Sequence, residues 1–85
     1  MKQLQLKGEL HKLIIKQFKI KKSKIKKNLS ADDVDEWDSL GHLSLISTIE
    51  KNFKIKFKNI DIPYILDEKR IYEKLSKIIK INDNR

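Results

Sequence analysis

The sequence has no cysteine, two glycines, one proline and two histidines among its 85 residues. Without cysteine, the chain can form no disulfide framework, no thiolate metal site and no cysteine nucleophile. Glycine-rich phosphate loops need several glycines close together, whereas Gly8 and Gly41 lie far apart. His11 and His42 are too few and too distant in sequence for a histidine-based zinc cage. We therefore expect neither a metal site nor a nucleotide-binding loop.

Long hydrophobic runs are also missing. No apolar stretch approaches the roughly 18 residues of a membrane span. The start, Met1-Lys2-Gln3-Leu4, has no continuous apolar segment of the signal-peptide kind. We expect a cytoplasmic protein without a membrane span. The length and the 39% hydrophobic content suffice for one small domain over residues 1–85, which we expect to be a monomer.

Charge is abundant but unevenly distributed. The 20 basic and 12 acidic residues give a net charge of +8, which favours a nucleic-acid or membrane-surface partner. Residues 1–27 contain ten lysines and one acid, whereas residues 28–50 contain six acids and no basic residue. Arginine, which pairs best with phosphates and base edges, supplies only two of the basic residues, and no aromatic stacking platform is clustered among the lysines. The lysines are therefore also consistent with an ordinary solvated surface.

Apolar residues recur at helical spacing in three segments. They predict helices over residues 2–18, 39–52 and 68–80. Asp38 and Asp67 precede the second and the last of these helices and are good N-cap residues. The core face of the second helix is expected to consist of His42, Leu45, Ile46, Ile49 and Phe53. The residues after the last helix, from Asn82 to Arg85, are expected to fray.

The connections between these helices differ in kind. Residues 19–38 form a long connection that is expected to be anchored to the core by Leu29, Val34 and Trp37. Residues 53–57 alternate at period two, but because no similar segment exists to pair with them, we expect an extended connector. Asp61 and Pro63 predict a short helix over residues 61–66. The predicted fold is an all-α, small four-helix bundle with three longer helices, one short helix and a long first loop.

No catalytic constellation is visible, and we expect a non-enzyme. Asp38, Ser39 and His42 contain the residue types of a triad. Three neighbours on one short stretch cannot converge as a proton relay, and Ser39 has no oxyanion partner. Ser39 would nevertheless lie at the positive end of a helix, where a phosphodiester on its hydroxyl would be stabilised by free backbone N–H groups. By position alone, an alternative N-cap is the simpler interpretation of Ser39.

The wider pattern around Ser39 resembles the attachment segment of acyl carrier proteins, which are phosphopantetheine-binding domains. A Trp-Asp-Ser-Leu-Gly-His segment at residues 37–42 is followed by aliphatic residues at helical spacing, then by Glu50, Phe53 and Ile55. The family has Asp-Ser-Leu, helically spaced aliphatics, a Glu and a Phe that closes the helix before a short aliphatic loop. The order of predicted helices also fits along nearly the whole chain, so the resemblance implies a bundle of the acyl-carrier type.

The resemblance implies specific roles. Ser39 would carry a covalent 4′-phosphopantetheine, transferred from coenzyme A by a Mg²⁺-dependent phosphopantetheinyl transferase that recognises Asp38. The thiol of that arm would hold an acyl or aminoacyl group as a thioester. Further partners would be an acyl- or aminoacyl-loading enzyme and a downstream acyltransferase or synthase. The implied partner interface consists of Glu36, Leu40, Leu43, Ser47 and Glu50.

Several alternatives stay open. Leu40 and Leu43 could be buried in the core instead of facing partners. Gly41 and Ser44 stand where carriers of fatty acid synthesis often have Asp or Glu, so the resemblance is closer to stand-alone carriers of specialised pathways. A small basic nucleic-acid-binding module that uses residues 1–27 is the alternative function, and a plain helical interaction domain is a third. Nucleic acid is not the partner that we expect.

Overall fold

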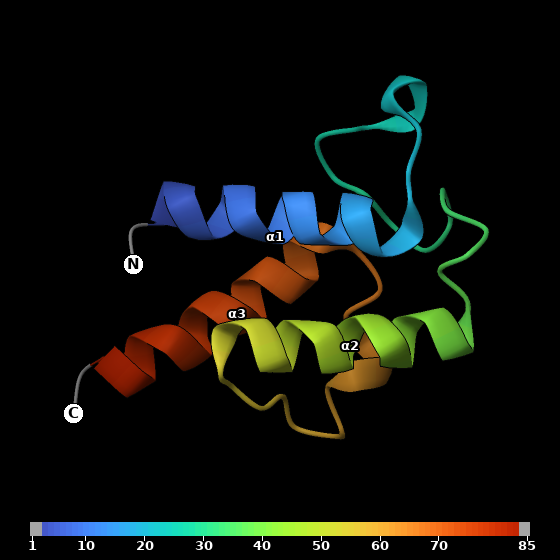
Figure 1. Cartoon of the computed structure of the whole chain (residues 1–85). Helices are drawn as coiled ribbons and strands as arrows, with labels where there is room; N and C mark the ends of the chain where they lie inside the picture. Colours follow the sequence, from blue (N-terminus) through green and yellow to red (C-terminus); the bar gives the residue numbers. More distant parts are fainter. Residues whose placement is uncertain (1–2, 84–85) are drawn as a thin grey trace.

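Three α-helices form most of the computed structural model, which describes the backbone of residues 3–83 and the side chains of residues 5–80 (Figure 1). The helices are α1 (Gln3–Phe18), α2 (Ser39–Phe53) and α3 (Glu68–Asp83). Two single turns of 3₁₀ helix, η1 (Lys22–Lys24) and η2 (Ile62–Tyr64), lie in the connections. Residues 3–83 contain no strand, and an isolated bridge joins Ser30 to Asp67. The expectation of an all-α fold is confirmed.

The helix starts follow the predicted caps. The Asp38 carboxylate accepts a hydrogen bond from the Gly41 N–H at 2.8 Å, and that of Asp67 accepts one from the Arg70 N–H at 2.8 Å. α2 ends where Lys54 adopts a left-handed conformation with φ 56°. Its N–H bonds to the Glu50 carbonyl oxygen, which satisfies one of the open carbonyls of the last turn.

Two predicted boundaries are wrong. The expected helix over residues 61–66 is the single turn η2, and the Asp61 side chain does not cap it. That carboxylate instead lies 3.6 Å from Lys74 Nζ on α3. α3 continues to Asp83, beyond the predicted end at residue 80, while Asn84 and Arg85 of the expected frayed tail lie outside the described residues. Lys2 of the first predicted helix also lies outside them.

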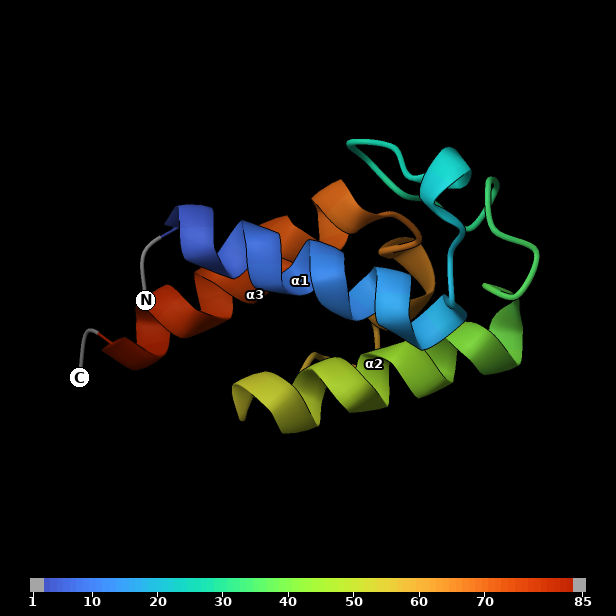
Figure 2. The ribbon, with the colours of Figure 1, turned by 45° about the horizontal axis from the view of Figure 1, so that its top comes forward.

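The core lies between α1 and the other two helices. α1 packs against both α2 and α3, as Figures 1 and 2 show from two directions. Each helix contributes fully buried aliphatic side chains, namely Leu10, Ile14, Leu45, Ile49, Ile71 and Leu75. Burial of one such side chain contributes about 1.5–3 kcal/mol relative to exposure, so these residues dominate the stability of the fold.

The connector after α2 forms no strand, as expected, but Phe53 of the predicted connector is the last residue of α2 and Lys54 is left-handed. Ile55 and Phe57 are buried, whereas Lys54, Lys56 and Lys58 are exposed, so the period-two alternation arises without a strand partner. Ile55 and Phe57 therefore belong to the same hydrophobic core as the helices.

The long first connection is attached to the core in its second half. The predicted anchors Leu29, Val34 and Trp37 are all buried. The Leu29 carbonyl accepts a hydrogen bond from the Glu68 N–H at 2.7 Å, and the Ala31 N–H donates to the Leu66 carbonyl at 2.9 Å. These bonds fix residues 29–31 against the start of α3, and the buried Val34 and Trp37 attach the rest of the loop to the core before Ser39.

A buried carboxylate holds the same junction from inside. Glu68 is 5% exposed, and its oxygens lie 2.8 and 2.9 Å from His11 Nδ1 on α1. The Leu29 N–H also donates to Glu68, at 3.3 Å. Because buried charges are costly unless they are paired, this contact ties α1, α3 and the first loop together.

None of the helices in the described part of the chain combines the length and the apolar character that a membrane crossing requires.

Candidate functional site

Ser39 is the first residue of α2, and its side chain is exposed. Asp38 satisfies two N–H groups of the first turn: its carboxylate accepts from Gly41, and its carbonyl accepts from His42 at 2.7 Å. The N–H groups of Ser39 and Leu40 make no such bond within residues 3–83. The start of α2 therefore retains free donors and the positive end of the helix dipole beside the Ser39 hydroxyl.

Trp37 and His42 form a buried hydrogen-bonded pair at the start of α2. Trp37 is 3% exposed and His42 is 5% exposed. The Trp37 Nε1–H donates to His42 Nδ1 at 2.9 Å, and His42 Nε2 lies 2.7 Å from the Ile62 carbonyl oxygen. An indole N–H only donates, so His42 Nδ1 is the acceptor and Nε2–H donates to Ile62. The imidazole thus links the first loop, α2 and η2.

Aromatic stacking extends the same support to α1. The Trp37 ring stacks on Phe18, with centroids 5.3 Å apart, and its centroid lies 6.2 Å from that of the His42 ring. His42 belongs to the core face, as expected from its position. Both its ring nitrogens are bonded away from Ser39, so a Ser39–His42 relay has no geometric support.

Gly41 has a steric reason to be glycine. A Cβ atom built at this position would overlap the backbone carbonyl oxygen of Glu36 and would lie 3.1 Å from Phe18 Cε1. The loop backbone therefore passes directly against the first turn of α2. The sequence suggested only that an acidic residue was missing here, whereas the structure leaves no room for any side chain.

A hollow of about 440 Å³ lies beside Ser39. Ser39 and Asp38 form its polar edge, and its apolar wall consists of Ala31, Trp37, Leu43, Ile62, Pro63 and Leu66. The wall thus comes from the first loop, from α2 and from the η2 connection. An extended, partly apolar group attached to Ser39 would find a surface to lie against.

An apolar stripe is exposed next to this hollow. Leu40 is 81% exposed and Leu43 is 57% exposed, so the alternative that they are buried in the core is wrong. Tyr64 and Leu66, from the η2 connection, are exposed as well. Leu40 and Leu43 lie one turn apart on α2, and adjacent exposed apolar side chains of this kind are typical of binding surfaces.

The structure brings together only part of the predicted interface. Glu36, Asp38, Ser39, Leu40 and Leu43 gather around the start of α2, and all five are exposed. Ser47 is exposed about two turns further along the helix, and Glu50 about three turns along.

Glu50 forms a hydrogen bond that stabilises the fold. It is half-buried, and its Oε2 accepts a hydrogen bond from the Phe57 N–H at 2.9 Å. Its side chain therefore holds the extended connector against the end of α2, which is a role that the sequence did not reveal.

The acidic segment before Ser39 is partly paired. Lys26 Nζ lies 3.1 Å from Asp33 Oδ1, and the Ser30 hydroxyl donates to Asp33 Oδ2 at 3.0 Å. The hydrogen bond from Lys26, helped by that from Ser30, lowers the pKa of Asp33 below its ordinary value. Asp35 and Glu36 are exposed, so negative charge remains available near the helix start.

Sequence reasoning missed the Trp37–His42–Ile62 chain of hydrogen bonds and the pairing of His11 with Glu68. The first could have been suspected from an indole donor placed five residues before an imidazole across a helix start. The second joins residues 57 apart in sequence, and no local signal marks it.

Within the described residues, no three His, Asp or Glu side chains are arranged to hold a metal ion. Comparisons of the chain with protein-family models, with curated proteins and with solved structures find no match, so a function has to be argued from the geometry around Ser39.

Proposed function

We propose that the chain is a stand-alone acyl carrier protein whose attachment residue is Ser39. The observation that carries this proposal is an exposed serine at the first position of α2, beside an apolar hollow and free backbone donors. Ser39 is not needed as the N-cap of α2, because the Asp38 carboxylate already caps the helix. The hydroxyl of Ser39 is thus left for another use.

The residues present fit a 4′-phosphopantetheine group on Ser39. The N–H groups of Ser39 and Leu40 would face its phosphate, and the helix dipole would stabilise the negative charge. Leu43, Ile62 and Pro63 would lie along the arm. Once bound, the group supplies a thiol that holds an acyl or aminoacyl cargo as a thioester, which is chemistry that a chain without cysteine cannot provide itself.

A separate phosphopantetheinyl transferase would attach the group. The Ser39 hydroxyl oxygen would form a bond to the pantetheine-bearing phosphorus of coenzyme A, and the bond from that phosphorus to the nucleotide half would break. The hydroxyl proton would leave to a base of the transferase. Asp38, exposed beside the hydroxyl, would contribute to recognition by that enzyme.

The fold supports the same proposal at a finer level. Three α-helices, a long first loop and the turn η2 in place of a short helix would form a bundle of the acyl-carrier type. In this arrangement the chain is not an enzyme, and its surface presents the loaded arm to a loading enzyme and to a downstream acyltransferase or synthase. The exposed Leu40 and Leu43 would make apolar contacts, and Glu36 would contribute to partner choice through charge.

Modification in vitro tests the proposal. The purified chain is incubated with coenzyme A, Mg²⁺ and several broad-specificity transferases, and its intact mass is measured. The wild type should gain one phosphopantetheinyl unit, and Ser39→Ala should gain none. Ser44→Ala, which removes another exposed serine of α2, is the matched control and should be modified like the wild type. An unmodified wild type, or a modified Ser39→Ala, would overturn the assignment.

A further inference from the structure

The first half of the long connection forms a concentrated basic surface. Residues 19–27, named here the lysine loop, contain six lysines in nine positions, and all six are exposed. The loop stands out from the C-terminal end of α1, on the side away from α2, in both Figure 1 and Figure 2. The lysine loop and the body of α2 therefore lie on different sides of α1, and residues 33–36 border the loop on its way to α2.

The lysine loop has a defined conformation, and hydrogen bonds hold it. Lys19 adopts a left-handed conformation with φ 50°, which turns the chain sharply after α1. The turn η1 is closed by a hydrogen bond from the Lys24 N–H to the Lys21 carbonyl at 2.8 Å. At the far end, the Asn28 side chain accepts a hydrogen bond from the Lys69 N–H at 2.9 Å. Both ends are thus fixed to helices, and the turn holds the lysines outward.

Most of this positive charge is not used within the described part of the chain. Lys26 is the one lysine of the loop that forms an ion pair there, with Asp33. An open hollow is lined by Lys19, Lys21 and Lys24 together with acidic side chains of residues 33–36. The carboxylates partly screen the positive charges of these three lysines. Lys22 and Lys27 lie outside that hollow. A charged surface therefore remains for an external anionic partner.

One of the two apolar side chains in the lysine loop is exposed, whereas the other, Ile20, packs against the core. Ile25 is 38% exposed and follows η1 directly. A basic cluster with an exposed aliphatic side chain suits the interface of an anionic lipid bilayer, where lysines contact headgroups and the aliphatic group enters the acyl boundary. Residues 19–27 contain neither arginine nor an aromatic residue, so they lack the groups that read or stack on nucleic-acid bases.

We propose that the lysine loop docks the protein reversibly on anionic lipid bilayers. In this orientation α2 lies on the side of the molecule away from the bilayer (Figures 1 and 2). Ser39, the exposed first residue of α2, would then stay accessible to partner enzymes. The docking does not depend on the proposed modification of Ser39, because the lysine loop contains neither Ser39 nor any residue that lines the hollow beside it.

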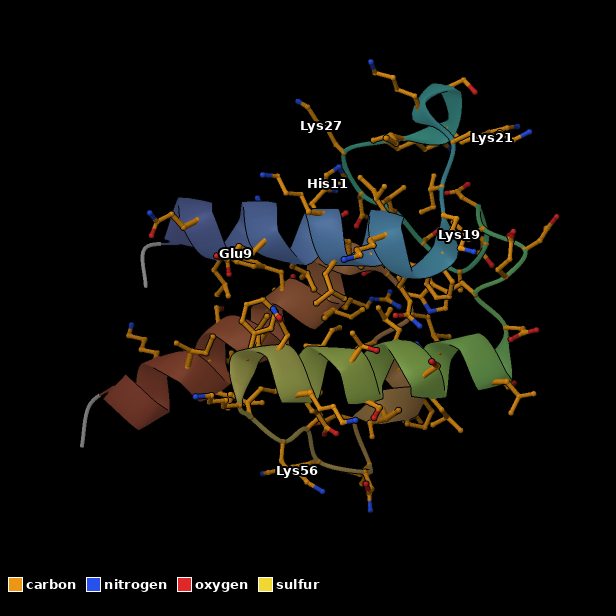
Figure 3. The ribbon with its side chains drawn as sticks, in the orientation of Figure 1. Glu9, His11, Lys19, Lys21, Lys27 and Lys56 are labelled. Atoms are coloured by element: carbon orange, nitrogen blue, oxygen red, sulfur yellow. The ribbon has the colours of Figure 1, made fainter. Side chains whose placement is uncertain are left out.

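Vesicle flotation with matched charge variants tests this. Vesicles of equimolar phosphatidylglycerol and phosphatidylcholine should bind the wild type at low salt, and vesicles of phosphatidylcholine alone should not. The variant K21Q/K22Q/K24Q should lower the partition by about ten- to a hundredfold, because Lys22 makes the usual contribution of a lysine near an anionic surface and Lys21 and Lys24 are partly screened. The control K54Q/K56Q/K58Q removes the same charge from exposed residues of the connector after α2 and should change the partition less than about threefold. Figure 3 shows Lys56 on the opposite side of the molecule from Lys21 and Lys27.

Two further variants separate a lipid partner from nucleic acid, and membrane docking from the carrier function. Ile25→Ser should weaken vesicle binding several-fold but leave any binding to an oligonucleotide unchanged. Ser39→Ala should bind vesicles like the wild type, so a failure of docking and a failure of the carrier assignment are distinguishable. Equal losses in the two triple variants, no binding to anionic vesicles at low salt, or oligonucleotide binding that displaces the vesicles and ignores Ile25→Ser would each overturn the proposal.

Discussion

Replacing His42 by leucine tests the support beneath the start of α2. The imidazole accepts from Trp37 and donates to the Ile62 carbonyl, and leucine can do neither. Each buried polar group left without a partner costs about 1–3 kcal/mol. In the variant, water that enters through the adjoining hollow would bond to the unpaired Trp37 and Ile62 groups and reduce this cost. Burial of the leucine side chain would offset a further part of it. We therefore expect a net loss of about 2–3 kcal/mol.

That loss is large for a domain of this size. Domains of 85 residues have total stabilities of about 4–13 kcal/mol, and each kcal/mol corresponds to about 4–8 °C in melting temperature. His42→Leu should therefore melt about 10–20 °C below the wild type. Circular dichroism reports the helices, and the fluorescence of Trp37, the single tryptophan, reports the loop.

His42→Gln is the control, because an amide side chain can both accept and donate. It should recover part of the lost stability, and its tryptophan emission should stay closer to that of the wild type. A His42→Leu variant that melts at or above the wild-type temperature, with unchanged emission, would refute the reasoning. The two hydrogen bonds would then make no net contribution to stability.

Three other predictions concern Gly41, Asp33 and Leu40. Gly41→Ala should destabilise the fold by more than about 1 kcal/mol because its Cβ overlaps the loop backbone, whereas Gly8→Ala, with no atom within 4 Å, should stabilise it by about 0.5–1 kcal/mol in the same thermal melt. Asp33 has a lowered pKa in the folded state, so its contribution to stability is present above its ordinary value of about 3.8 and is lost as the pH falls through the lowered value. A carboxylate titration by NMR should therefore show a higher Asp33 pKa in Lys26→Gln than in the wild type, and an equal pKa would remove the lysine as the cause. Leu40→Ala should leave stability within about 0.5 kcal/mol but slow modification by the transferase, and an unchanged rate would remove Leu40 from the interface.

Local patterns in the sequence predicted the helices and their caps well, because those features depend on neighbouring residues. The spacing of apolar side chains identified the buried face of α2 except for Phe53, which is half-buried. It left open whether Leu40 and Leu43 are exposed, which the structure shows them to be. Asp38 caps α2 as a residue of its type before a helix should. The position of Ser39 at the surface follows from these local rules alone.

Features that depend on distant segments were not predictable in this way. Asp61 precedes Pro63 like a helix cap, yet its carboxylate lies near Lys74 and η2 remains a single turn. Gly41 is required because the loop backbone lies against it, which no pattern within α2 indicates. The bond from His42 to Ile62 joins segments 20 residues apart, and only the packed fold brings them together.

The carrier assignment is tested most directly by mass spectrometry of the protein purified from its native source. The intact mass should include one phosphopantetheinyl unit, with or without an acyl cargo, and fragmentation of the peptide that contains Ser39 should place the group on that residue. A chain that is wholly unmodified, or a modification located on a different residue, would contradict the assignment.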